Sequence, residues 1–181
     1  MNGQVVVVGL LQTFFGIGVA LSIAVLAVHT LGRALRWRDI ESDIRSGNGA
    51  AGIVFGAALA ACGILVQPAV VATFDAMDFL YRGAELQLGM LIAFLLYAIV
   101  HLGSAVGIAV VVIGSCCRLF DSATGKLDEM AEARRGNFAA ATLLAGVFLL
   151  VALMVAPGLK LVLSGLLPFP ELPRNTVPAP S

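Results

Sequence analysis

The first long stretch of the chain without a charged side chain is residues 5–31, VVVVGLLQTFFGIGVALSIAVLAVHTL. About 20 apolar residues cross the hydrocarbon core of a bilayer as a helix, so this stretch is long enough to span it. Of the 181 residues, 60% are hydrophobic and 12% are charged. A soluble domain carries about 25% charged residues. The composition therefore predicts an integral membrane protein.

Three further apolar runs follow, at residues 50–74, 88–117 and 139–167, and the last is interrupted only by Lys160. Backbone N–H and C=O groups inside hydrocarbon must bond to one another, which makes these runs helices. The sequence thus predicts an all-α fold, a polytopic integral membrane protein with four transmembrane helices. No Lys or Arg precedes the first run, so we expect a true span there and not a cleaved signal peptide.

The positive charges are distributed unequally between the links. Eight of the eleven Lys and Arg residues lie in the link between the first two spans or in the link between the last two. Lys and Arg are enriched in cytoplasmic links. We therefore expect both termini outside and the two basic links in the cytoplasm. The eleven acidic residues bring the net charge to zero, so we expect no nucleic acid among its partners.

These two basic links are copies of one sequence. At a constant offset of 89 residues, DIESDIRSGNGAA at 39–51 aligns with DEMAEARRGNFAA at 128–140. We call these segments the first and the second corner. Each lies between two spans, so the pattern predicts two tandem, parallel two-helix repeats. The chain then divides into a first unit with its outer link at 1–87, a second unit at 88–167, and a proline-rich, disordered tail at 168–181.

The corners have a structural interpretation that needs no ligand. Gly47 and Gly136 can each close a short surface helix in the left-handed conformation. Asn48 and Asn137 can each cap the following span, and acidic residues can pair with Arg at helical spacing, as Glu41 with Arg45. The functional alternative is a paired cytoplasmic binding site for a phosphate or a lipid head group, with Arg135 included among its cations. The candidate residues are Asp39, Asp43, Arg45, Gly47, Asn48, Asp128, Glu132, Arg134, Gly136 and Asn137.

The doubled corner resembles the family catalogued as domain of unknown function 350, whose two-helix units carry acidic-x-x-Gly-Asn-x-Ala-Ala-like junctions before a span. The likeness runs from the first span to about Pro157, and Ser46 opposite Arg135 departs from an even repeat. The resemblance implies a multi-pass protein of the bacterial inner (plasma) membrane. It implies no activity.

Two kinds of residue within the spans are candidates for packing or transport. Glycines four residues apart, Gly52 with Gly56 and Gly103 with Gly107, let helix backbones approach, within the chain or between copies. The third span carries Tyr97, His101 and Ser104 on one face, and the repeat alignment places Gln12 opposite His101. These four residues form a candidate intramembrane polar face, which either bonds across helices or lines a proton pathway.

The remaining features carry little chemistry. Cys62, Cys116 and Cys117 match no metal-site spacing, so we expect free thiols and no cofactor. Pro68 and Pro157 are expected to kink or end their spans, and residues 75–87 are expected to form an amphipathic helix on the outer leaflet.

The leading hypothesis is a non-enzymatic, homo-oligomeric membrane subunit that engages lipid, or cytoplasmic or membrane protein partners, through its corners. The alternative is a small channel or transporter whose pathway runs past Gln12, Tyr97 and His101. An enzyme that uses the corner acids ranks last, because no nucleophile or metal set accompanies them.

Overall fold

The computed structural model describes residues 3–83, 88–124 and 128–166, and all of its regular elements are helices. The helices are α1 (Gly3–Ala34), α2 (Ile40–Arg45), α3 (Gly49–Gly83), α4 (Leu88–Thr124), α5 (Glu129–Arg134) and α6 (Phe138–Leu166). Four of them, α1, α3, α4 and α6, are long and apolar enough to cross a membrane. The predicted all-α, four-span architecture is confirmed, and the chain is a multi-pass membrane protein. The tail at 168–181 lies outside the described residues.

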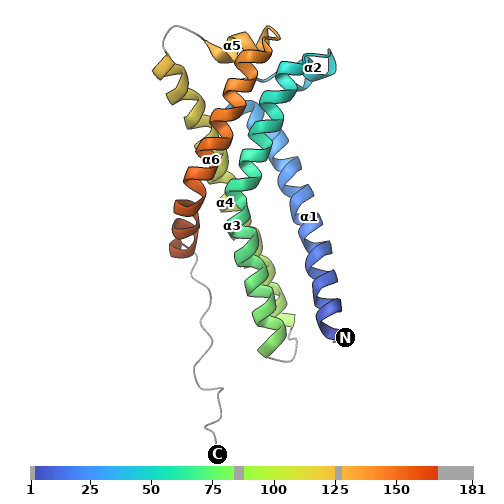
Figure 1. Cartoon of the computed structure of the whole chain (residues 1–181). Coiled ribbons are helices and arrows are strands. Elements are labelled where there is room, and N and C mark those ends of the chain that lie inside the picture. Colours follow the sequence, from blue (N-terminus) through green and yellow to red (C-terminus); the bar gives the residue numbers. More distant parts are fainter. Residues whose placement is uncertain (1–2, 84–87, 125–127, 167–181) are drawn as a thin grey trace, which may run out of the picture.

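The two short helices lie at the same end of the bundle, where α1 and α4 finish and α3 and α6 begin (Figure 1). We call this end, which carries both corners, the basic end. The first residues of α1 lie at the opposite end. The four long helices therefore alternate in direction, as a chain that crosses a bilayer repeatedly must do.

The equivalent helices of the two predicted repeats, α3 and α6, pack side by side in the most extensive interface of the bundle (Figure 1). The next largest is between α3 and α4, and α1 packs on α3 and α4. The fully buried side chains include Leu31 of α1, Leu65 of α3, and Leu144 and Phe148 of α6. The core therefore draws on both predicted repeats, and the repeat division itself remains a prediction.

Neither proline ends its helix. Pro68 lies inside α3, which continues to Gly83, and Pro157 lies inside α6, which continues to Leu166. A proline removes only one backbone hydrogen bond, and transmembrane helices tolerate this loss where neighbouring groups compensate. The expected separate helix at 75–87 is therefore wrong for residues 75–83, which continue α3, while residues 84–87 lie outside the described part.

The glycine pairs do not mediate packing within the chain, which corrects the first of their two expected uses. A Cβ atom added at Gly52, Gly56, Gly103 or Gly107 would meet no atom within 4 Å. Close approaches occur elsewhere, because a Cβ on Gly114 of α4 would lie 3.4 Å from the carbonyl oxygen of Ala34 at the end of α1. Spacing of glycines shows that they share a helix face, but it does not show which neighbour that face meets.

Candidate functional site

The first corner is a helix stop followed at once by a helix start. Gly47 has φ +91°, and its N–H donates to the carbonyl of Ile44 at 3.1 Å. The N–H of Asn48 donates to the carbonyl of Asp43 at 2.9 Å, which completes a Schellman motif at the end of α2. The Asn48 side chain then caps α3, because its Oδ1 accepts the N–H of Ala51 at 3.1 Å.

The second corner repeats this geometry. Gly136 also has φ +91°, and its N–H donates to Ala133 at 3.0 Å. The N–H of Asn137 donates to Glu132 at 3.0 Å, and its Oδ1 accepts the N–H of Ala139 at 3.0 Å. The capping roles predicted for both Gly-Asn pairs are confirmed. A ligand-binding role for these residues stays a prediction.

The two corners touch each other directly. The side-chain amide of Asn48 donates through Nδ2 to the carbonyl of Arg134, across 86 residues of sequence, at 3.0 Å. A Cβ on Gly49 would lie 2.8 Å from Cζ of Phe138, so the ring rests on the backbone at the start of α3. Gly49 and Phe138 are equivalent in the repeat alignment. The two corners therefore lie side by side at the basic end and meet at equivalent positions.

The acidic candidate residues make different interactions within the corners. Asp128 caps α5, since its Oδ1 accepts the N–H of Ala131 at 2.8 Å, whereas Asp39 makes no such bond at the start of α2. Glu132 pairs with Arg135 at 2.8 Å. The expected pair of Glu41 with Arg45 is not among the ion pairs of the described residues, and both side chains are exposed.

Sequence reasoning missed a cluster around Trp37, which is 3% exposed. Its Nε1 donates to Oδ2 of Asp43 at 2.6 Å, and the guanidinium of Arg134 lies 5.6 Å from its ring centroid. Arg134 also donates through Nη2 to the carbonyl of Arg36 at 2.7 Å. The cluster thus joins the link between α1 and α3 to α5, which lies in the link between α4 and α6. A lone Trp among arginines at the end of a span was the available signal.

The intramembrane polar face is only partly assembled. His101 is 2% exposed and stacks on Tyr97, with ring centroids 5.2 Å apart and planes 17° apart. Neither ring nitrogen of His101 has a hydrogen-bond partner, so the expected bond between His101 and Gln12 is absent. Gln12 and Ser104 are half-buried. The structure therefore brings Tyr97 and His101 together, but the imidazole of His101 makes no hydrogen bond to Gln12.

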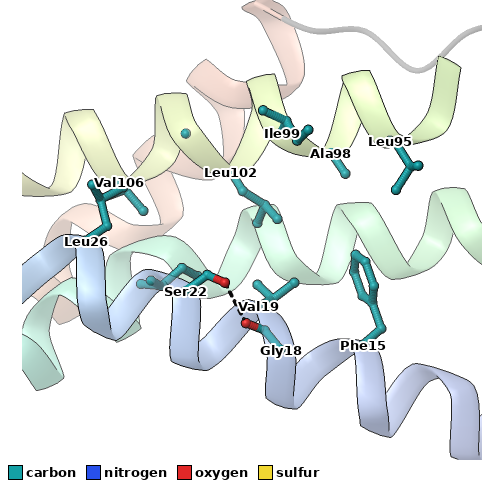
Figure 2. A pocket seen from close by; sticks show the side chains of 12 residues that line it. Phe15, Gly18, Val19, Ser22, Leu26, Leu95, Ala98, Ile99, Leu102 and Val106 are labelled. Carbon is teal, nitrogen blue, oxygen red and sulfur yellow. Dashed lines mark hydrogen bonds between the residues drawn. The ribbon is translucent and has the colours of Figure 1, made fainter. Parts of the chain in front are cut away.

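A cavity of about 530 Å³ lies between parts of α1 and α4, and none of the four polar-face residues lines it. Figure 2 shows apolar side chains from both helices around it, such as Val19, Leu102 and Val106. Its one hydroxyl, that of Ser22, donates to the carbonyl of Gly18 in its own helix at 2.8 Å. The lining is thus suited to acyl chains or apolar side chains and offers no charged group.

The outward face of α6 differs from the equivalent face of α3. Val54, Ala61 and Leu65 share one side of α3 and are fully buried. Their repeat equivalents on α6 are 51%, 57% and 71% exposed, and these are Leu143, Leu150 and Met154. This face is therefore covered on α3 within the chain and open on α6.

The thiols and potential metal ligands are not gathered into a site. Cys62, Cys116 and Cys117 are free and buried, as expected. Among the described residues, no group of three or more His, Cys, Asp or Glu side chains is placed to hold a metal ion.

Comparison with known proteins identifies a family. A family model described as Domain of Unknown Function (DUF350) matches residues 5–105 and again residues 96–166. The two matches together cover most of the chain, and each includes one of the corners. No curated protein and no solved structure matches it.

Proposed function

The chain belongs to the family DUF350, and from that premise we propose that it is a self-associating membrane subunit in which α6 of one copy packs against α1 of the next. The observation that carries the proposal is the open face of α6. The duplicated design indicates which helix should cover this face.

The argument starts from the neighbours of the two equivalent helices. α3, the second helix of the first unit, packs extensively against α4, the first helix of the second unit. The equivalent neighbour of α6 would be the first helix of a following unit. This face of α6 is exposed within the described residues, and we propose that α1 of a second copy covers it. Such a head-to-tail interface closes into a ring or continues as a row.

The exposure of α1 supports its choice as the helix that covers this face. It is the least buried of the four spans. Leu10, Phe14, Ile17, Leu21 and Val25 recur along it at helical spacing and are all exposed. Lipid can cover such a stripe, so exposure alone does not specify a partner. We choose α1 because it is the repeat equivalent of α4, and α4 packs extensively against α3.

Cysteine cross-linking in membranes tests this interface. Leu21 lies 13 residues before the end of α1 and Leu150 lies 12 residues after the start of α6, so both lie about 20 Å from the basic end. We expect the double variant Leu21→Cys/Leu150→Cys to give a ladder of disulfide-linked multimers on oxidation. Each single variant should give none, because the three native thiols are buried.

A depth-mismatched pair provides the control. Leu21→Cys combined with Leu161→Cys uses another exposed position on the same face of α6, 11 residues or about 16 Å further from the basic end than Leu150. This pair should stay unlinked. Equal cross-linking in both pairs would mean random collision, and no cross-linking in the first pair would contradict the α1–α6 interface.

The corners then serve as the surface for contacts outside the membrane. We place the basic end in the cytoplasm of a bacterial plasma membrane, since Lys and Arg favour the cytoplasmic side. Support for a non-enzymatic role comes from the acids of the corners. Asp128 caps a helix, Glu132 pairs with Arg135, and Asp43 accepts the indole N–H, so these carboxylates already have structural partners.

A second candidate function, a channel or transport pathway, is favoured by His101. A buried polar group without a hydrogen bond costs about 1–3 kcal/mol, so a purely structural residue at this position would be better replaced by an apolar one. A pathway past Gln12, Tyr97 and His101 would account for the imidazole.

The variant His101→Leu tests whether this side chain serves a transport pathway or has only a structural role. We expect it to raise the thermal unfolding temperature, because the unpartnered nitrogens disappear, and to abolish flux of protons or small solutes in proteoliposomes. Ser115→Ala, on an exposed position of the same helix, is the control. Unchanged flux in His101→Leu, or no flux in the unmodified chain across a panel of solutes, would exclude the pathway.

A further inference from the structure

A polar cavity of about 630 Å³ opens beside the first corner at the basic end. Its walls come from the end of α1, the link to α2, α2 itself and α5, so both predicted repeats contribute. The lining residues are Arg33, Arg36, Trp37, Arg38, Asp39, Asp43 and Arg134. In contrast to the apolar cavity between α1 and α4, this one is lined mainly by charged side chains.

The charge of this cavity is positive and not internally neutralised. Four arginines face two aspartates, and Asp43 accepts the indole N–H of Trp37. The only ion pair within the described parts of the chain joins Arg135 to Glu132, and neither residue lines the cavity. None of the four guanidinium groups therefore has a carboxylate of the described residues within salt-bridge distance.

The backbone at Arg36 adds an independent observation. α1 ends with the same pair of bonds as the corners, from Arg36 N–H to the carbonyl of Arg33 at 3.1 Å and from Trp37 N–H to that of Gly32 at 2.9 Å. The residue in the left-handed position is Arg36, with φ 54°, where both corners have glycine. A non-glycine residue is strained there, and such strain concentrates at binding sites.

We propose that this cavity binds a phosphate group, carried by an anionic lipid head group or by a soluble phosphorylated small molecule. Guanidinium groups form charge-assisted, bidentate bonds with phosphate oxygens. The cavity also holds the carboxylates of Asp39 and Asp43, which can accept hydrogen bonds from hydroxyl or amino groups beside the phosphate. The proposal extends the proposed function by naming a ligand class at the basic end. The cavity lies within one copy, so its binding test and the cross-linking test can fail separately.

The chain carries its own probe for this site, because Trp37 is its single tryptophan and lines the cavity. The full chain in phosphatidylcholine nanodiscs is titrated with glycerol 3-phosphate, and a parallel series replaces part of the lipid with phosphatidylglycerol. Trp37 fluorescence is read in both, with labelled glycerol 3-phosphate and phosphorus analysis of the delipidated chain as direct binding measurements. A saturable response to the lipid alone identifies a head-group site, and one to glycerol 3-phosphate identifies a soluble ligand. No binding in either series overturns the proposal.

Two arginine variants distinguish the cavity from general surface charge. We expect Arg36→Gly to weaken phosphate binding by roughly tenfold or more, because it removes one charge-assisted contact. The same variant should raise the thermal unfolding temperature, because it relieves the positive φ. Arg118→Gln, which removes an exposed charge of α4 outside the cavity, should change binding less than twofold, within about the range of a distant surface charge. Equal weakening by both variants would overturn the proposal.

Discussion

Replacing Trp37 with alanine should destabilise the chain more than any other change at the basic end. The side chain is 3% exposed and holds three contacts together, to Asp43, to Arg134 and to the core at the end of α1. Truncating a buried Trp costs about 3–5 kcal/mol. Thermal unfolding of the purified chain in nanodiscs, followed by circular dichroism, should therefore show a large drop in the unfolding temperature.

Trp37→Phe is the matched control for this change. It keeps most of the buried aromatic volume and the face presented to Arg134, but it loses the N–H that bonds Asp43 at 2.6 Å. We expect a loss of about 1.5–3 kcal/mol, that of one hydrogen bond to a charged group. A Trp37→Ala variant as stable as the unmodified chain would contradict the role of this cluster in joining the first link to α5.

Phe148→Ala should have a comparably large effect at the centre of the bundle. Phe148 is 2% exposed and is among the largest fully buried side chains of the structure. Removing a buried phenyl ring leaves a cavity and costs about 3–5 kcal/mol. Since α6 packs chiefly on α3, we expect the pairing of the two equivalent helices to weaken and the unfolding temperature to fall.

Phe14→Ala controls for the chemistry of the substitution. Phe14 lies on α1 and is 70% exposed, so its ring faces lipid in a single copy. Its truncation should change the unfolding temperature little in conditions that keep the chain monomeric. If the two phenylalanine variants were equally stable, the buried core described for α6 would be wrong.

The parts of the fold that depend on local chemistry were predictable from the sequence. Four apolar runs predict four helices because the bilayer leaves the backbone no other way to satisfy its hydrogen bonds. Gly47 and Asn48 predict a helix stop and a cap, because glycine favours positive φ and the asparagine carbonyl accepts a backbone N–H. The helices follow from the apolar runs alone, and the stop and the cap need only the residues within one turn.

The parts that depend on which helix meets which were not predictable. Gly52 and Gly56 share a face, but whether another helix lies against it depends on the crossing geometry of the whole bundle. Pro68 is a local helix breaker, yet the surrounding span keeps α3 continuous. In both cases tertiary packing decides the outcome, and the spacing of residues in sequence does not encode it.

In the candidate site, too, the local features were predictable and the contacts between helices were not. The corners and their charges were predicted, whereas the cavity lined by Arg33, Arg36 and Arg38 was not, because its shape depends on Arg134 reaching back from the other link. The repeat alignment could not reveal it either, since position 126, which is equivalent to Trp37, is a lysine. An alignment of the predicted repeats detects only the features that both share. It cannot detect a contact that one of them makes alone.

The central claim, that copies assemble through the open face of α6, is tested most directly by native mass spectrometry of the full chain released from lipid nanodiscs. The account predicts particles of two or more copies at native expression levels. Lowering the contact area with Leu150→Ala should shift them towards one copy. A single copy at every protein concentration, with the chain folded and bound to lipid, would contradict it.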